Sequence, residues 1–200
     1  MSVGREEYSS SCHSAWDVLV PARAAYLASV SPHYDEVFWD VAQRVKRAGS
    51  LGKTDIAALV VWKRLSAQTR WVTALMSLPD SHVRAITEQA VASVQNLGLS
   101  RSEAARAGRG AISELPGFAK GDALASAILT SAAPTRMAVY DRHVQRAIES
   151  LGLTLTDHSG RYGRYMGILD ALLEHSGGRA DGWTARDVDT ALYWAGKNPA

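Results

Sequence analysis

Residues 115–144 constrain the fold of this chain more than any other stretch. The segment opens with Leu115-Pro-Gly117, continues through a short polar stretch to Asp122, and then becomes an apolar run over Ala123–Leu129. A Pro-Gly pair predicts a tight turn, and the apolar run predicts a helix whose first amides point out of that turn. Because such amides attract anions, we expect a phosphate to bind here.

Asp141 closes a short extended run that follows this helix. The pattern of the next residues predicts a helix from Arg142 to Ser150, which makes Asp141 its N-cap. The chain therefore places one carboxylate at a helix start, about a dozen residues beyond the apolar helix.

Two of these segments resemble the helix-hairpin-helix DNA glycosylase superfamily, of the endonuclease III and adenine glycosylase type. They are Leu115-Pro-Gly117 and Val139-Tyr-Asp-Arg-His-Val144, and Leu65-Ser-Ala-Gln-Thr69 is similar to a third segment that lies by the DNA-facing cleft in that family. The resemblance implies an all-α fold of two helical lobes with the cleft between them. One lobe is expected from the middle of the chain through Ile148, and the other from both ends.

The resemblance also implies an activity, the cleavage of a modified or mismatched base from double-stranded DNA. In that reading Asp141 stabilises the positive charge that develops on the sugar and activates water. Lys120 lies near the place of the lysine that attacks C1′ in bifunctional members, but we favour a monofunctional enzyme in which Lys120 contacts a phosphate. The DNA contacts implied by the resemblance are Gly117, Phe118, Ala119, Gly121, Asp122, Gln68 and Arg142.

Other interpretations of the same residues stay open. Asp141 can be a cap alone, Trp62 and Trp71 can be core residues instead of parts of a base pocket, and Tyr140 and His143 can be packing residues. A helix-hairpin-helix protein that binds DNA without catalysis is favoured by the low net charge and by the altered hairpin, in which Ala119 stands where the family has a second glycine. A third possibility is an all-helical interaction domain unrelated to DNA. The arginines that could neutralise phosphates, or form a plain solvated face, are Arg84, Arg101, Arg106 and Arg109.

Composition limits which functional classes of protein this chain can belong to. The 200 residues carry a net charge of only +2, so any DNA-binding face requires local clustering of basic side chains. One cysteine, Cys12, excludes an internal disulfide and a four-cysteine iron-sulfur cluster, and no metal-spaced or nucleotide-cofactor motif is present, so we expect no cofactor. The N-terminus lacks a signal peptide and no apolar run spans a membrane, which predicts a cytoplasmic protein, and we expect a monomer.

Helix signals recur along the chain, and the alternation typical of strands is absent. Residues 1–13 are polar and serine-rich, so we expect a flexible arm before a single domain over 14–200. Ser31 followed by proline predicts the N-cap of a helix, and capping boxes at Ser100 and Thr184 predict two further helix starts.

Overall fold

The computed structural model describes residues 3–67 and 70–199. Within these ranges the chain forms ten α-helices and one 3₁₀ turn, with no strand, which confirms the all-helical prediction. The helices are α1 Val3–Ser29, α2 Glu36–Ala48, α3 Lys53–Trp62, α4 Arg70–Ser77, α5 Asp80–Gln95, α6 Arg101–Ala111, α7 Ala123–Ala132, α8 Arg142–Ser150, α9 Arg161–Glu174 and α10 Ala185–Lys197. None of them is both long and apolar enough to cross a membrane.

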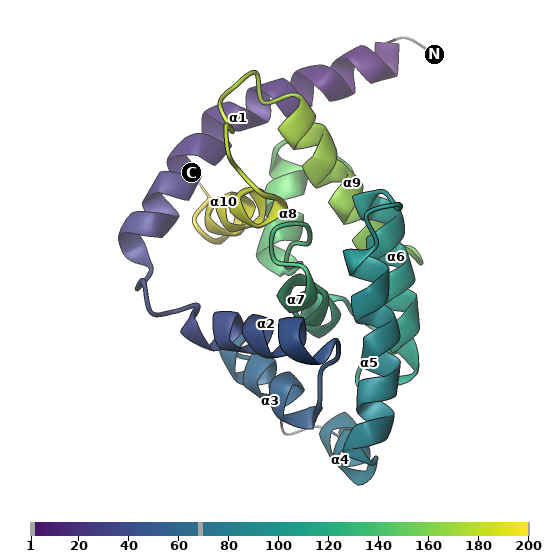
Figure 1. The fold of residues 1–200 in the computed structure, drawn as a ribbon. Coiled ribbons are helices and arrows are strands. Elements are labelled where there is room, and N and C mark those ends of the chain that lie inside the picture. Colours follow the sequence, from purple (N-terminus) through teal and green to yellow (C-terminus); the bar gives the residue numbers. More distant parts are fainter. Residues whose placement is uncertain (1–2, 68–69, 200) are drawn as a thin grey trace.

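Helix α7 lies at the centre of the molecule (Figure 1). Every residue from Leu124 to Ala132 is buried, as the nearly continuous apolar pattern of this segment requires. Its few hydroxyls bond to backbone carbonyls of the helix itself; Thr130, for example, donates to the carbonyl of Ser126 at 2.7 Å. Helices α2, α3, α5 and α6 pack around it, so the helix that follows the Pro-Gly turn holds the core together.

Residues 3–13, which were expected to belong to a flexible arm, form the first turns of helix α1. Helix α1 begins at Val3 and continues past Pro21 to Ser29, although an interior proline removes one backbone hydrogen bond and crowds the preceding turn. Tertiary packing holds this helix in place. Cys12 and Trp16 are fully buried, and the indole of Trp16 donates to the carbonyl of Leu172 at 2.9 Å.

The starts of several helices agree with the sequence signals. Ser100 and Thr184 each form the predicted capping box. The cap hydroxyl accepts a hydrogen bond from the backbone amide three residues later, and the acidic side chain of that later residue accepts a hydrogen bond from the amide of the cap residue. Helix α2 differs, since it begins at Glu36 instead of next to Ser31. The Ser31 hydroxyl accepts a hydrogen bond from the amide of His33, which forms a turn and postpones the helix.

Helices α8 and α10 approach each other closely enough to exclude a side chain at Gly196. A Cβ atom built there would lie 1.9 Å from the carbonyl oxygen of His143. The His143 ring packs edge-on against Tyr193 of α10, with ring centroids 5.5 Å apart. The first turn of α8, which Asp141 caps, is therefore fixed against the C-terminal helix.

Candidate active site

Asp141 has the two kinds of partner that a carboxylate can use at the start of a helix. Its Oδ1 accepts hydrogen bonds from the amides of His143 at 2.8 Å and Val144 at 3.1 Å, which confirms the predicted N-cap. Its Oδ2 lies 2.9 Å from the Nζ of Lys63. One oxygen thus serves the helix, and the other faces a cation.

The charge of Asp141 is stabilised in spite of burial. Burial raises the pKa of this carboxyl, but the Lys63 ammonium and the two cap amides together lower the pKa below its ordinary value. Asp141 and Lys63 expose only 15% and 14% of their side chains. The site therefore holds an ionised carboxylate next to an ammonium in a poorly solvated place, where charges interact strongly.

The segment that carries Asp141 is extended, and side chains from three other helices hold its backbone. Tyr162 donates to the carbonyl of Ala138, and Tyr165 donates to that of Val139. The amide of Val139 donates to Asp189, and the amide of Tyr140 donates to Ser126. This extended run has no strand partner, so the surrounding hydroxyls and one carboxylate satisfy its polar groups and fix where Asp141 begins α8.

Lys63 comes from a distant part of the chain and was not among the predicted site residues. It follows the last residue of α3, in a turn where the amide of Arg64 donates to Val61 and the amide of Leu65 donates to Val60. The pair of bonds is that of a Schellman turn, which ends a helix and redirects the chain. A lysine and an arginine directly after a buried apolar helix were the available signal.

Asp141 and Lys63 line a cavity of about 950 Å³, within the range of small-molecule sites. Five cationic side chains and two carboxylates are among its described lining residues, which gives an excess of three positive charges with His143 neutral. The cations are Lys63, Arg64, Arg142, Arg186 and Lys197, and the carboxylates are those of Asp141 and Asp189. The local clustering that a low net charge demands is present here, and it favours an anionic ligand.

Aromatic side chains supply much of the remaining wall, from Tyr26, Tyr34, Trp62 and Tyr193. Trp62 is mostly buried, and its indole donates to Asp35 at 2.9 Å, so it acts as both core and wall. Trp71 does not line this cavity. It packs instead on the Pro-Gly turn, against the Cα of Gly117 and at 6.4 Å from the Phe118 ring. An apolar wall with basic groups suits a ligand that has a flat ring and a negative charge.

A buried ion network closes the back of the cavity. The Arg186 guanidinium pairs with Asp189 and Asp35 and lies over the rings of Phe38 and Trp62 at 5.7 and 5.5 Å. Burial raises the pKa of Asp189 to about 6, while Arg186 and Lys63 act in the opposite direction. Both charges of the Arg186 and Asp189 pair are therefore engaged within the fold.

The Pro-Gly turn adopts the expected geometry. The amide of Phe118 donates to Leu115 at 3.0 Å, and Gly117 has a φ of 91°, as the third position of a type II turn requires. Ala123, the first residue of α7, lines the cavity, but none of the turn residues 115–118 is among the lining residues. Gly121, which has a φ of 74°, Ala119 and Lys120 are exposed, and none of the three is among the residues that line the cavity.

Two other predicted contacts are directed inward. The Phe118 side chain is fully buried. Asp122 is also buried, where its two oxygens accept from Arg109 and Arg161, each at 2.8 Å. Neither side chain is therefore free for the predicted DNA contact, and the Phe118 amide and the Asp122 carbonyl are already bonded to Leu115 and Ser126.

The remaining predicted contacts divide as follows. Arg142 is exposed at the first position of α8 and lines the cavity, whereas Gln68 lies outside the described residues. Among the arginines considered for phosphate binding, most are engaged within the fold: Arg84 pairs with Asp80, Arg101 with Asp170 and Arg109 with Asp122. Apart from Arg142, the basic groups that line the cavity are thus different from those that the sequence indicated.

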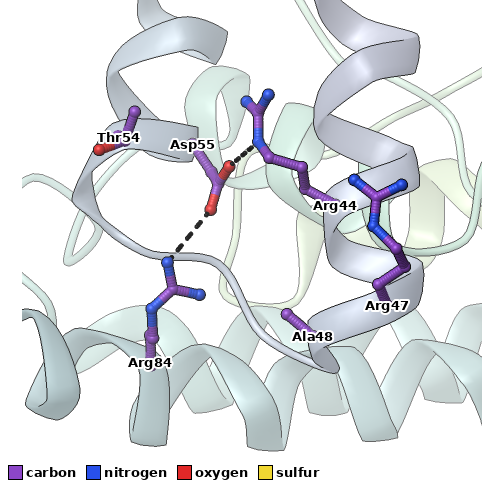
Figure 2. A pocket seen from close by; sticks show the side chains of 6 residues that line it. All are labelled: Arg44, Arg47, Ala48, Thr54, Asp55 and Arg84. Carbon is purple, nitrogen blue, oxygen red and sulfur yellow. Dashed lines mark hydrogen bonds and ion pairs between the residues drawn. The ribbon is translucent and has the colours of Figure 1, made fainter.

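A second, smaller depression of about 360 Å³ lies between α2, α3 and α5 (Figure 2). Arg44, Arg47 and Arg84 surround it, but the Asp55 carboxylate sits between two of these guanidinium groups. Asp55 Oδ1 is 2.7 Å from Arg44, and Oδ2 is 3.8 Å from Arg84. Because a carboxylate of the chain occupies the position that an anion would take, this cluster has a structural role.

The described residues offer no group of three or more histidine, cysteine, aspartate or glutamate side chains arranged to hold a metal ion. No protein-family model matches the chain, and neither the curated proteins nor the solved structures contain a match. The cavity around Asp141 and Lys63 is thus the basis for an assignment of function.

Proposed function

We propose that this protein is a DNA N-glycosylase that uses Asp141 in the cavity lined by the end of α3, the start of α8 and the length of α10. The observation that carries the proposal is that the two carboxylate oxygens of Asp141 have different environments. One oxygen is held by cap amides, which fixes the carboxylate, and the other faces a basic, aromatic-walled cavity. The resemblance of residues 115–117 and 139–144 to helix-hairpin-helix glycosylases supports the same role.

The chemistry follows from a fixed negative charge beside a bound nucleotide. As the C1′–N bond lengthens, its electron pair leaves with the base and positive charge develops on the sugar, which the Asp141 carboxylate stabilises. Water then supplies the oxygen that bonds to C1′, and its proton compensates for the charge on the departing base. No covalent bond to the enzyme forms in this sequence.

Lys63 is proposed as the charge partner of Asp141 in place of a nucleophile. An ammonium hydrogen-bonded to a carboxylate has no free electron pair, so it cannot attack C1′ in that state. Lys120 stays a predicted phosphate contact on the exposed turn.

The test is base release from a panel of short duplexes that carry different damaged or mismatched bases. We expect release from at least one duplex by the natural chain, and a loss of about 10²–10³ in rate for Asp141→Asn with DNA binding retained. The Asn side chain caps a helix about as well as Asp, so helix α8 should persist in the variant. Full release by Asp141→Asn would remove Asp141 from the reaction.

Borohydride trapping separates the two possible roles of a lysine. A lysine that attacks C1′ forms an imine, which borohydride reduces to a stable crosslink, whereas water activation leaves no adduct. We expect no crosslink from the natural chain or from Lys120→Ala. A crosslink that disappears in Lys63→Met would make Lys63 a nucleophile and the enzyme bifunctional.

A second candidate function is DNA binding without catalysis. The observation that favours it is that both oxygens of Asp141 already have partners within the fold. It predicts salt-dependent duplex binding with no base released from any duplex. An all-helical interaction domain unrelated to DNA predicts neither.

A further inference from the structure

Arg64 has a backbone conformation that its residue type rarely adopts. Its φ is 55°, and it is the one residue other than glycine with a positive φ in the described part of the chain. Arg64 occupies the position of the Schellman turn after α3 that glycine takes most often, because a side chain there is crowded by the backbone. A strained residue at a cavity is a reason to ask what its side chain does.

The side chain of Arg64 has no carboxylate partner among the described residues. Its guanidinium lies 5.7 Å from the centre of the Tyr34 ring and 3.4 Å from the hydroxyl of Tyr193. Both neighbours are neutral side chains that line the same cavity. They orient the guanidinium without neutralising it, which leaves its charge and most of its donors open to an anion.

Two further cations of the cavity share this property. Arg142 is exposed at the start of α8 and pairs with no carboxylate among the described residues. Lys197 lies over the rings of Tyr193 and Trp194, at 5.8 and 5.7 Å. The cations of the cavity therefore form two groups. Lys63 and Arg186 are mostly buried and paired with carboxylates, whereas Arg64, Arg142 and Lys197 are exposed and have no carboxylate partner in the described part of the chain.

We propose that Arg64 binds a backbone phosphodiester of a nucleic-acid strand, with Arg142 and Lys197 completing the site at the rim of the cavity. The ligand class is a nucleotide within a polynucleotide, because three cations from three different segments at one cavity match a chain of phosphates better than a single anion. The strained turn directs the guanidinium to the rim, while Lys63, one residue earlier, faces Asp141. This inference rests on the proposed function for the identity of the strand as DNA.

The test compares duplex binding by Arg64→Gly, Arg64→Asn and Arg64→Lys over a series of chloride concentrations. The probe is a short fluorescent duplex that contains a tetrahydrofuran abasic-site analogue. We expect the Gly and Asn variants to bind several-fold more weakly, with the slope of log Kd against log salt reduced by about one unit. Arg64→Lys, which keeps the charge, should retain the slope.

The matched control is Arg47→Asn, which removes the same charge from the exposed end of α2, outside the cavity. An equal loss of slope in this control would reduce the effect to net charge and overturn the proposal. Thermal unfolding adds a readout that a structural role predicts differently. Gly and Asn relieve the strained φ, so Tm should stay level or rise while binding weakens. Binding and slope unchanged in Arg64→Gly would overturn the proposal, as would a fall in Tm that accounts for the weaker binding.

Inorganic phosphate distinguishes a strand from a free anion. If phosphate displaces the duplex no better than chloride at equal ionic strength, the site requires a polynucleotide. Selective displacement would instead assign the site to a small phosphate. Failure of the proposed function is separate, because binding that depends on Arg64 can persist in a protein that releases no base. Conversely, if Arg64→Gly releases base and binds DNA normally, Arg64 is not a phosphate contact and the proposed glycosylase function still holds.

Discussion

A double-mutant cycle on Lys63 and Asp141 measures the coupling at the centre of the cavity. The variants are Lys63→Met, Asp141→Asn and the two together, since methionine keeps the length of the lysine stem and asparagine keeps the helix cap. The two charged atoms are 2.9 Å apart and both side chains are about 15% exposed. At an effective dielectric constant of about 20, their gross attraction is about 6 kcal/mol.

The net effect is smaller, because both groups lose hydration when the protein folds. Removing one partner of a buried pair typically costs about 3–5 kcal/mol, chiefly because it strands the other charge. Asp141 keeps two amide donors, and both side chains retain some contact with water, so we expect each single variant to lose about 2–3 kcal/mol. For a chain of this size, that loss corresponds to a fall in Tm of about 5–10 °C.

Urea unfolding of the four proteins gives the coupling energy. The double variant leaves no stranded charge, so we expect it to be more stable than the two single losses predict, by at least about 1.5 kcal/mol. A coupling energy below about 0.5 kcal/mol would refute the reasoning, since it would mean that water screens the pair as it does on a surface. The same variants are then compared in the base-release assay. Because the two single variants are expected to lose similar stability, a difference in their rates of base release reports a difference in chemical role.

Three further outcomes follow from the same contacts. The folded-state pKa of Asp141 is lowered, so the ion pair with Lys63 stabilises the fold above the ordinary aspartate pKa and loses this effect as pH falls through the lower folded value. The difference in free energy of unfolding between the natural chain and Lys63→Met should therefore shrink below about pH 4. Gly196→Ala should destabilise by about 3 kcal/mol or more through its clash with His143, whereas Gly167→Ala, which meets nothing within 4 Å in α9, should leave unfolding in urea unchanged or slightly harder. Asp122→Asn should lower Tm by several degrees, since it removes the carboxylate partner of Arg109 and leaves Arg161 only the exposed Asp157. An unchanged Tm would show the ion pairs of Asp122 to be dispensable.

Local signals predicted the helix starts that depend on nearby residues. Ser100, Thr184 and Asp141 each bond to amides two or three residues further on, so the sequence alone contains both partners. The helix start predicted at Ser31 was wrong, because the serine hydroxyl can also accept a hydrogen bond that forms a turn. The first turns of α1 could not be predicted in this way, since the helix is held by Trp16 and its bond to Leu172, far along the chain.

The site was only half predictable for a comparable reason. Asp141 was identifiable because a cap has a local pattern, but its partner Lys63 lies 78 residues earlier and meets it only through the packing of α3 against the core. Lys120, predicted from its closeness to the Pro-Gly turn in sequence, is instead exposed outside the cavity lining. Distance along the chain was a poor guide to distance in space, because α7 separates the turn from Asp141 by a complete buried helix.

The turn after α3 explains how adjacent residues take such different environments. Trp62 is the last residue of the helix and remains in the core, Lys63 is half-buried against Asp141, and Arg64 emerges at the rim. A helix that continued would turn successive side chains by a regular 100° step, whereas the left-handed residue reverses the chain within one position. Glycine would form this turn with less strain, so the arginine has a cost in the folded state that its side chain must offset. Since its neighbours there are two tyrosines, the charge of Arg64 is available for the phosphodiester proposed above.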